Sequence, residues 1–131
     1  MRLYSQAIRF WTHFNQIKKL LNGNLDDYYV ATALAMECFQ AANSLIDIAT
    51  KLVSENSLGF PQNAVNAFEL LMKHGLIEKE ELEAAKRAIY LRNLIAHEYH
   101  AIEKEDLLDL YNALESLQAF VRRAEIKNGE S

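Results

Sequence analysis

The stretch DLLDLYNALESLQAFV, residues 106–121, indicates most clearly how this chain folds. Its large apolar residues recur at steps of three and four, at Leu107, Leu110, Leu114, Leu117 and Val121. Because an α-helix turns once every 3.6 residues, this spacing places them on one face, as in the seam of a helix bundle. The stretch therefore predicts a helix from about Lys104 to Arg123 that packs against other helices.

The same spacing predicts further helices upstream of this stretch. Their expected ranges are about 3–21, 26–54, 62–73 and 78–99. Asn22-Gly23, the loop ENSLGFP and His74-Gly75 separate them, since glycine and proline interrupt helices. We expect Asn24 or Asp26 to cap the second helix and Pro61 to occupy the first position of the third.

The composition agrees with one helical domain. The chain has 131 residues with four glycines and one proline, and 50% of its residues are hydrophobic. These values favour long helices around a substantial core over a turn-rich all-β fold. We expect one domain over residues 1–131, an all-α, up-and-down four-helix-type bundle with the short third helix as an addition. The polar tail, about 125–131, is expected to fray.

Charge and targeting patterns narrow the class of protein. A net charge of −4 gives no general field for nucleic acid, so any RNA contact needs a local basic patch. The net charge suggests either a small substrate footprint or a basic patch formed only by dimerisation. The candidates for that patch are Lys86, Arg87, Arg92, Arg122 and Arg123. No continuous apolar segment resembles a signal peptide or a membrane span, and the single cysteine, Cys38, fits a reducing compartment. We expect a cytoplasmic protein with no membrane contact and a buried, structural Cys38.

The segment LRNLIAHEYH, residues 91–100, differs from the rest of its helix because polar and ionisable residues crowd into it. At about 100° per residue, Asn93 and His97 share one face, and Arg92 and Tyr99 share another. Arg92 and His97 lie about 140° apart. Either the long Arg92 side chain wraps around the helix, or a two-fold dimer brings two copies of the segment together. We favour the dimer.

These residues suit phosphodiester cleavage without a metal. His97 would move the proton of the 2′-hydroxyl or of the leaving oxygen, and Arg92 would hold the charge on the phosphorane. Asn93 would orient the His97 ring, and Tyr99 would contact a phosphate or a base.

Several alternatives remain open from the residues alone. His97 could be a histidine at the core edge, and Arg92 could pair with Glu98 or Asp106. His97 and His100 have a spacing that metal ligands use, but without a clear carboxylate partner we predict no metal site. Asp47 either pairs with Lys51 at the surface, with Asn43 as its other neighbour, or faces the fourth helix and holds Arg92.

RNLIAHEY resembles the Arg-Asn-x-x-x-His-x-Tyr motif of HepT-like proteins, a branch of the HEPN superfamily. The upstream segment LIDIATKLVSENSLGFPQNAVNAFELLMKHGLI is similar to the same family in its Asp-Ile-Ala helix, its Gly-x-Pro loop and its Phe-Glu-Leu-Leu segment. The specific match covers about residues 36–111. After Tyr99 many relatives carry aspartate, and His100 stands there in this chain.

The resemblance implies an all-α homodimer that acts as a metal-independent endoribonuclease toxin of a type II toxin–antitoxin module. Arg92 and His97 would form the catalytic pair in a cleft between protomers, with no cofactor. The implied partner is an MntA-type nucleotidyltransferase antitoxin, which would transfer AMP to Tyr99. Two other functions stay open: a non-catalytic substrate- or nucleotide-binding subunit of a nucleotidyltransferase pair, and a purely structural bundle.

Overall fold

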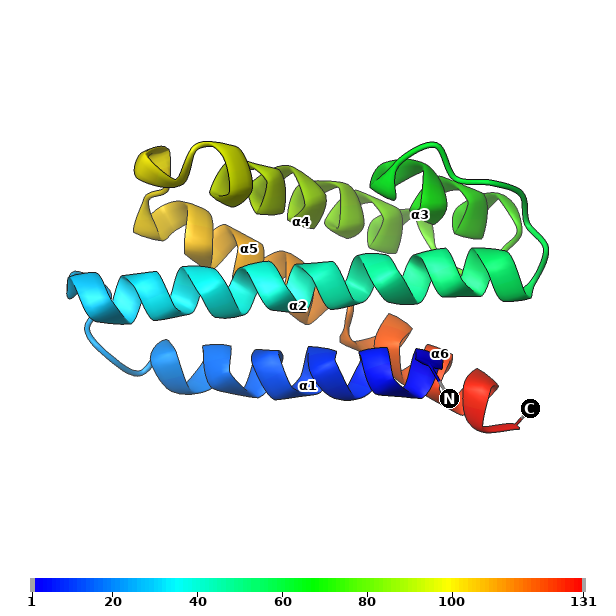
Figure 1. Ribbon diagram of the computed structural model, residues 1–131, viewed down its shortest axis with the longest axis horizontal. Coiled ribbons are helices and arrows are strands. Elements are labelled where there is room, and N and C mark those ends of the chain that lie inside the picture. The colour runs from blue at the N-terminus through cyan, green and yellow to red at the C-terminus, as the bar shows by residue number, and fades with distance from the viewer. Residues whose placement is uncertain (1, 131) are drawn as a thin grey trace.

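The computed structural model describes the backbone of residues 2–130 and the side chains of residues 5–126. Its helices are α1 (Arg2–Leu20), α2 (Tyr28–Glu55), α3 (Ala64–Lys73), α4 (Lys79–His97), the 3₁₀ turn η1 (Tyr99–Ala101), α5 (Lys104–Ser116) and α6 (Gln118–Glu130). The four long helices α1, α2, α4 and α5 alternate in direction, and α3 lies beside α4 (Figure 1). The predicted all-α, up-and-down bundle with a short extra helix is confirmed. None of the described helices is long and apolar enough to cross a membrane.

The helix caps differ from those predicted for α2 and α3. Asp27, one residue after the predicted Asp26, caps α2, and its carboxylate accepts hydrogen bonds from the N–H groups of Tyr29 and Val30. Asn63 caps α3 by accepting from the N–H of Asn66, so Pro61 lies in the preceding loop. In both cases several polar residues precede the helix, and spacing alone does not select the one that caps it.

The predicted last helix is two helices that meet at Leu117. The N–H of Leu117 bonds to the carbonyl of Leu114, three residues back, at 3.0 Å. The hydroxyl of Ser116 and the amide of Gln118 donate to other backbone carbonyls nearby. Such local bonds compete with the helical ladder. The apolar spacing passes through the break unchanged, so spacing could not predict it. The frayed tail stays a prediction, because α6 continues to Glu130 and Ser131 lies outside the described residues.

Aromatic side chains of α1 form the centre of the core. Phe10 and Phe14 are fully buried, and the Phe14 ring stacks on Phe10 at 5.4 Å and on Tyr111 of α5 at 5.6 Å between centroids. Burying a side chain of this size stabilises the fold by about 1.5–3 kcal/mol. This cluster joins the α1–α2 pair to α5 and so holds these helices together in the core.

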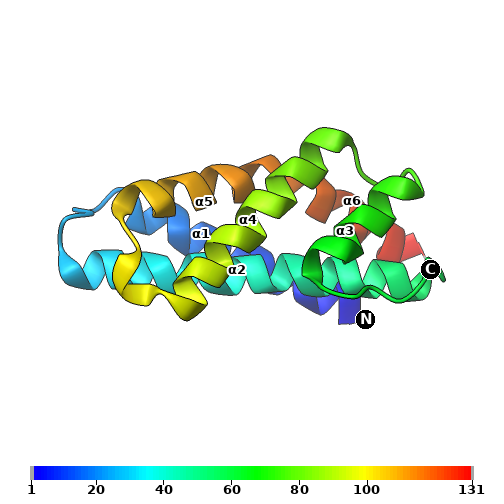
Figure 2. The same cartoon turned by 90° about the horizontal axis from the view of Figure 1, so that it is seen from above.

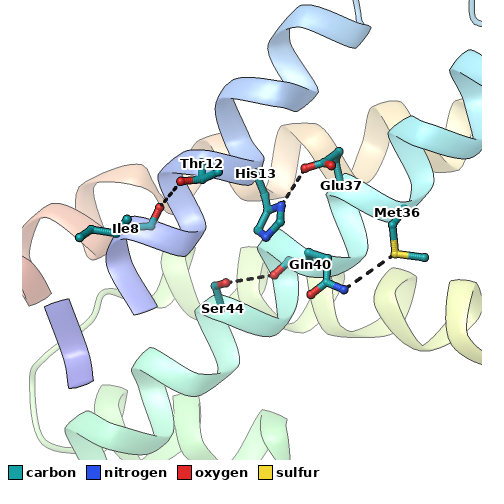
Figure 3. A network of polar contacts seen from close by, with 7 residues as sticks. All are labelled: Ile8, Thr12, His13, Met36, Glu37, Gln40 and Ser44. Atoms are coloured by element: carbon teal, nitrogen blue, oxygen red, sulfur yellow. Dashed lines mark hydrogen bonds and ion pairs between the residues drawn. The ribbon is translucent and has the colours of Figure 1, made fainter. Parts of the chain in front are cut away.

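Polar contacts line the edge where α1 meets α2 (Figure 3). His13 Nδ1 of α1 lies 2.7 Å from Glu37 Oε1 of α2, and both side chains are partly buried. Ser44 and Thr12 each donate to a carbonyl within their own helix. The His13–Glu37 contact is therefore the one in this group that joins the two helices.

Candidate active site at the end of α4

The motif segment occupies the C-terminal end of α4 and the turn that follows it. The last regular contact is the bond from the N–H of Glu98 to the carbonyl of Leu94, at 2.8 Å. The N–H of Ala101 then bonds to the carbonyl of Glu98, also at 2.8 Å, which closes a tighter turn. α4 thus ends at His97, before the expected Tyr99. The predicted shared face of Arg92 and Tyr99 is wrong, because Tyr99 no longer follows the α-helical rotation.

Helix α4 crosses α2 obliquely (Figure 2). Arg92 of α4 is partly buried. Its Nη1 donates to the side-chain oxygen of Asn43 on α2 at 3.2 Å. Its Nε is buried and has no hydrogen-bond partner. Asn43 is neutral, so it fixes the guanidinium in place without cancelling its charge.

Most other residues of the predicted basic patch pair with carboxylates, whereas Arg92 does not. Arg87 pairs with Asp109 at 2.5 Å, Arg123 with Glu81 at 2.7 Å and Lys86 with Glu83 at 3.4 Å. The hydrogen bond to Asp109 raises the pKa of Arg87 above its usual value. Among the described residues no ion pair involves Arg92, and the expected alternatives Glu98 and Asp106 do not contact it. Arg122 makes no ion pair among the described residues either, and its guanidinium lies over the Trp11 ring at 5.1 Å. Arg92 is therefore the cation of this group that donates a hydrogen bond to a neutral side chain in place of a carboxylate partner.

A cavity of about 330 Å³ opens beside Arg92 and Asn93, where α4 faces the first turn of α3. The other residues that line it are Asn63, Ala64, Val65, Glu69 and Ile89. Glu69 is held by the side chain of Asn66 at 3.2 Å. The cavity gives the Arg92 region a route to solvent and space for a small anionic group.

His97 and Asn93 are both exposed on α4. Within the part of the chain that the structure describes, no hydrogen bond joins Asn93 to His97, and His97 does not line the cavity beside Arg92. One protomer therefore presents an inward arginine and an outward histidine, as their angular separation on the helix predicts. The orientation of His97 by Asn93 stays a prediction.

The second supporting residue, Asp47, is exposed and takes no part in the contacts of Arg92. No ion pair among the described side chains joins it to Lys51 either. Asn43, one helical turn before Asp47, makes the contact to Arg92 that was considered for Asp47. Cys38 lies fully buried, as expected, and burial raises the pKa of its thiol from 9.0 to about 12.

Tyr99 lines a different and larger cavity, of about 570 Å³. This cavity lies between η1, the start of α5 and the N-terminal turns of α2, and Tyr28, His100 and Lys104 also line it. Tyr99 is 40% exposed, so part of the residue is accessible from solvent. No group of three or more His, Cys, Asp or Glu side chains in the described residues is placed to hold a metal ion.

A helical bundle with an Arg-Asn-x-x-x-His-x-Tyr segment at the end of its fourth helix defines a HEPN-type protein. A family model described as ribonuclease HepT-like matches residues 6–124, and this chain belongs to that family. The resemblance seen in the sequence is thereby confirmed.

Individual known proteins also resemble this chain in sequence or in structure. The mRNA nuclease HepT of Shewanella oneidensis is 24% identical over 96 residues, which is 72% of each chain. The solved structure of a tri-AMPylated Shewanella oneidensis HEPN toxin in complex with MNT antitoxin has a TM-score of 0.84 at 21% identity and covers 96% of each chain. A toxin–antitoxin structure with AMP-PNP has a TM-score of 0.84 at 19% identity and covers 93% of this chain and 96% of that one. These structures share the fold.

Two parts of the site were not predicted from the sequence. Asn43 lies in the long α2 helix. In the sequence it was linked to the motif only as the residue one helical turn before Asp47. The cavity beside Tyr99 is built from residues about seventy positions apart, including Leu25 and Tyr28. No local spacing indicates such a contact, because it depends on how α2 and α5 pack.

Proposed function

We propose that this chain is an endoribonuclease toxin of a toxin–antitoxin module, with Arg92 and His97 as its catalytic residues. The observation that carries the proposal is the state of Arg92. Asn43 fixes its guanidinium, no carboxylate among the described residues neutralises it, and it lies one and a half turns from a histidine in a family of ribonucleases. A fixed, unpaired cation suits the stabilisation of a developing phosphorane charge.

The reaction is a transesterification at a phosphodiester of RNA. The 2′-oxygen attacks the neighbouring phosphorus, and the bond from phosphorus to the 5′-oxygen breaks. One imidazole takes the proton of the 2′-hydroxyl, and an imidazolium returns a proton to the leaving 5′-oxygen. Arg92 donates to the non-bridging oxygens throughout. The products are a 2′,3′-cyclic phosphate and a 5′-hydroxyl end.

The active form is a homodimer in this proposal. A single protomer has its Arg92 facing α2 and its His97 exposed to solvent, and His97 does not line the cavity beside Arg92. A two-fold axis near the end of α4 would supply two copies of each residue to one cleft. It would also provide an acid and a base from the same residue type.

The partner in this proposal is a nucleotidyltransferase antitoxin of the MntA type. It transfers AMP from ATP to Tyr99: the tyrosine oxygen bonds to the α-phosphorus, pyrophosphate leaves, and the hydroxyl proton is released. A similar modification is named for the Shewanella oneidensis HEPN toxin, which is tri-AMPylated. The exposed position of Tyr99 supports its role as the acceptor.

The test compares purified wild type with His97→Ala on a defined RNA, and analyses the product ends. We expect cleavage by the wild type, with 2′,3′-cyclic phosphate ends, and a loss of at least about 100-fold in the variant. Intact RNA with wild-type protein that binds nucleotides would instead support the alternative, a binding subunit of a nucleotidyltransferase pair. Equal cleavage by both proteins would exclude His97 from the reaction.

A further inference from the structure

The cavity that Tyr99 lines is not used by the cleavage mechanism. It measures about 570 Å³, within the roughly 300–1,000 Å³ of pockets that bury small ligands. Tyr99, the proposed AMP acceptor, lines it, and so does His100. We propose that this cavity receives the adenine of the AMP carried by Tyr99 and so holds the modified toxin in one closed state. This inference rests on the proposed modification of Tyr99.

The lining of the cavity suits a purine base. One part is apolar and comes from α2, α5 and the connections that precede them: Leu25, Ala31, Ala35, Ile102 and Leu107. Tyr28 also lines the cavity, and its ring is 70% exposed although it belongs to the first turn of α2. An exposed tyrosine ring beside an apolar cavity offers a stacking surface, and stacking of a base on an aromatic ring is favourable for every base.

The charges around the cavity distinguish an adenylyl group from an RNA strand. Asp26, Glu103 and Glu105 line it as carboxylates, against one ammonium group, Lys104. Lys104 Nζ is held by Asp26 at 3.0 Å, and that hydrogen bond raises the Lys104 pKa, so the ammonium charge is already paired. A strand of RNA would bring several phosphates past these carboxylates and be repelled. AMP attached to Tyr99 brings only one phosphate, which lies at the mouth of the cavity.

The attachment point also favours this occupant. A group carried by Tyr99 is present at high effective concentration in a cavity that Tyr99 itself lines, so weak contacts suffice to fill it. Filling it would connect η1 to the first turns of α2 and α5. The chain immediately after His97 would then be tied to the rest of the bundle, and this is the segment that the proposed cleft between protomers requires.

The test begins with protein modified by an MntA-type nucleotidyltransferase and ATP, with the site of AMP checked by mass spectrometry. In the modified protein we expect nuclear Overhauser contacts from adenine H2 or H8 to the methyl groups of Ala31 and Ala35. Modification should also raise the melting temperature. In modified Tyr28→Ala, the ratio of protein with the adenine in the cavity to protein with the adenine outside it should fall at least about fivefold. This is the lower limit for the loss of one stacking contact.

The matched control is Tyr29→Ala. Tyr29 is the next residue, is 80% exposed and contacts the Tyr28 ring at 5.5 Å, but it does not line the cavity. It should keep the contacts and the shift in melting temperature. Neither substitution touches Arg92, His97 or Tyr99, so cleavage by the unmodified protein should be unchanged in both.

The outcomes separate the two proposals. Absence of AMP from Tyr99 overturns the proposed modification and this inference with it. AMP on Tyr99 with an adenine that contacts no methyl group, or equal behaviour of the two tyrosine variants, overturns the inference alone. The inference also fails if the bases of a non-cleavable 2′-deoxy RNA analogue contact Ala31 and Ala35 in unmodified protein while the attached adenine does not.

Discussion

The substitution Asn43→Asp tests whether the uncompensated charge of Arg92 drives the reaction. It keeps the shape of the side chain and places a carboxylate where Arg92 Nη1 already donates, at 3.2 Å. A phosphate bound on the other side of the guanidinium would lie roughly 7 Å from that carboxylate. At an effective dielectric constant of about 20, Coulomb's law gives about 2.4 kcal/mol of added repulsion for one unit of charge. This corresponds to a fall of about 50-fold in kcat/KM.

The assay is cleavage of a fluorophore–quencher RNA at substrate concentrations well below KM. The control is Asn15→Asp, which makes the same change of charge at an exposed position on α1, on the opposite side of α2 from α4 (Figure 1). Thermal unfolding should show no loss of stability in Asn43→Asp, since the new carboxylate gains a partner. If kcat/KM of a folded Asn43→Asp protein stays within about threefold of the control, the charge of Arg92 is not what the reaction uses.

Four further predictions concern the core, the buried thiol and the proposed AMP acceptor. Phe14→Ala should lower the free energy of unfolding by about 3–5 kcal/mol in urea denaturation, and a loss below 1 kcal/mol would contradict its central place in the core. The raised pKa of Cys38, about 12, predicts that iodoacetamide does not label the folded protein at pH 9. Stability should also fall between pH 9 and 12, where the unfolded thiol ionises and the buried one does not; Cys38→Ala should lack that part of the pH dependence. Tyr99→Phe should keep nuclease activity and lose labelling by radioactive ATP with the nucleotidyltransferase, and persistent labelling would place the acceptor elsewhere.

Much of the fold could be predicted because helix faces follow from spacing within one segment. The buried Leu107, Leu110 and Leu114 lie on the predicted face, as do Phe10 and Phe14 on α1. Helix ends were less predictable. They depend on which polar side chain reaches a free N–H group, as Asp27 does, and on local bonds such as those around Leu117.

The site could be predicted only in part, for a related physical reason. Arg92, Asn93 and His97 lie within one helix, so their relative directions followed from its rotation. The partner of Arg92 depends on where α4 crosses α2, and there Asn43 rather than Asp47 faces the guanidinium. Tyr99 departed from prediction because the chain must turn back after His97 for α5 to begin at Lys104.

The end of α4 at His97 has a consequence for how such proteins can diverge. Arg92 and His97 belong to one rigid helix, whereas Tyr99 belongs to a short connection between helices. Insertions or deletions after His97 would move the tyrosine relative to its cavity and leave the arginine–histidine spacing unchanged, because connections tolerate changes in length that helices do not. In the proposed mechanism, the cleavage chemistry and its control by a partner would therefore vary independently, and such a nuclease would exchange its antitoxin without rebuilding the helix that carries Arg92 and His97.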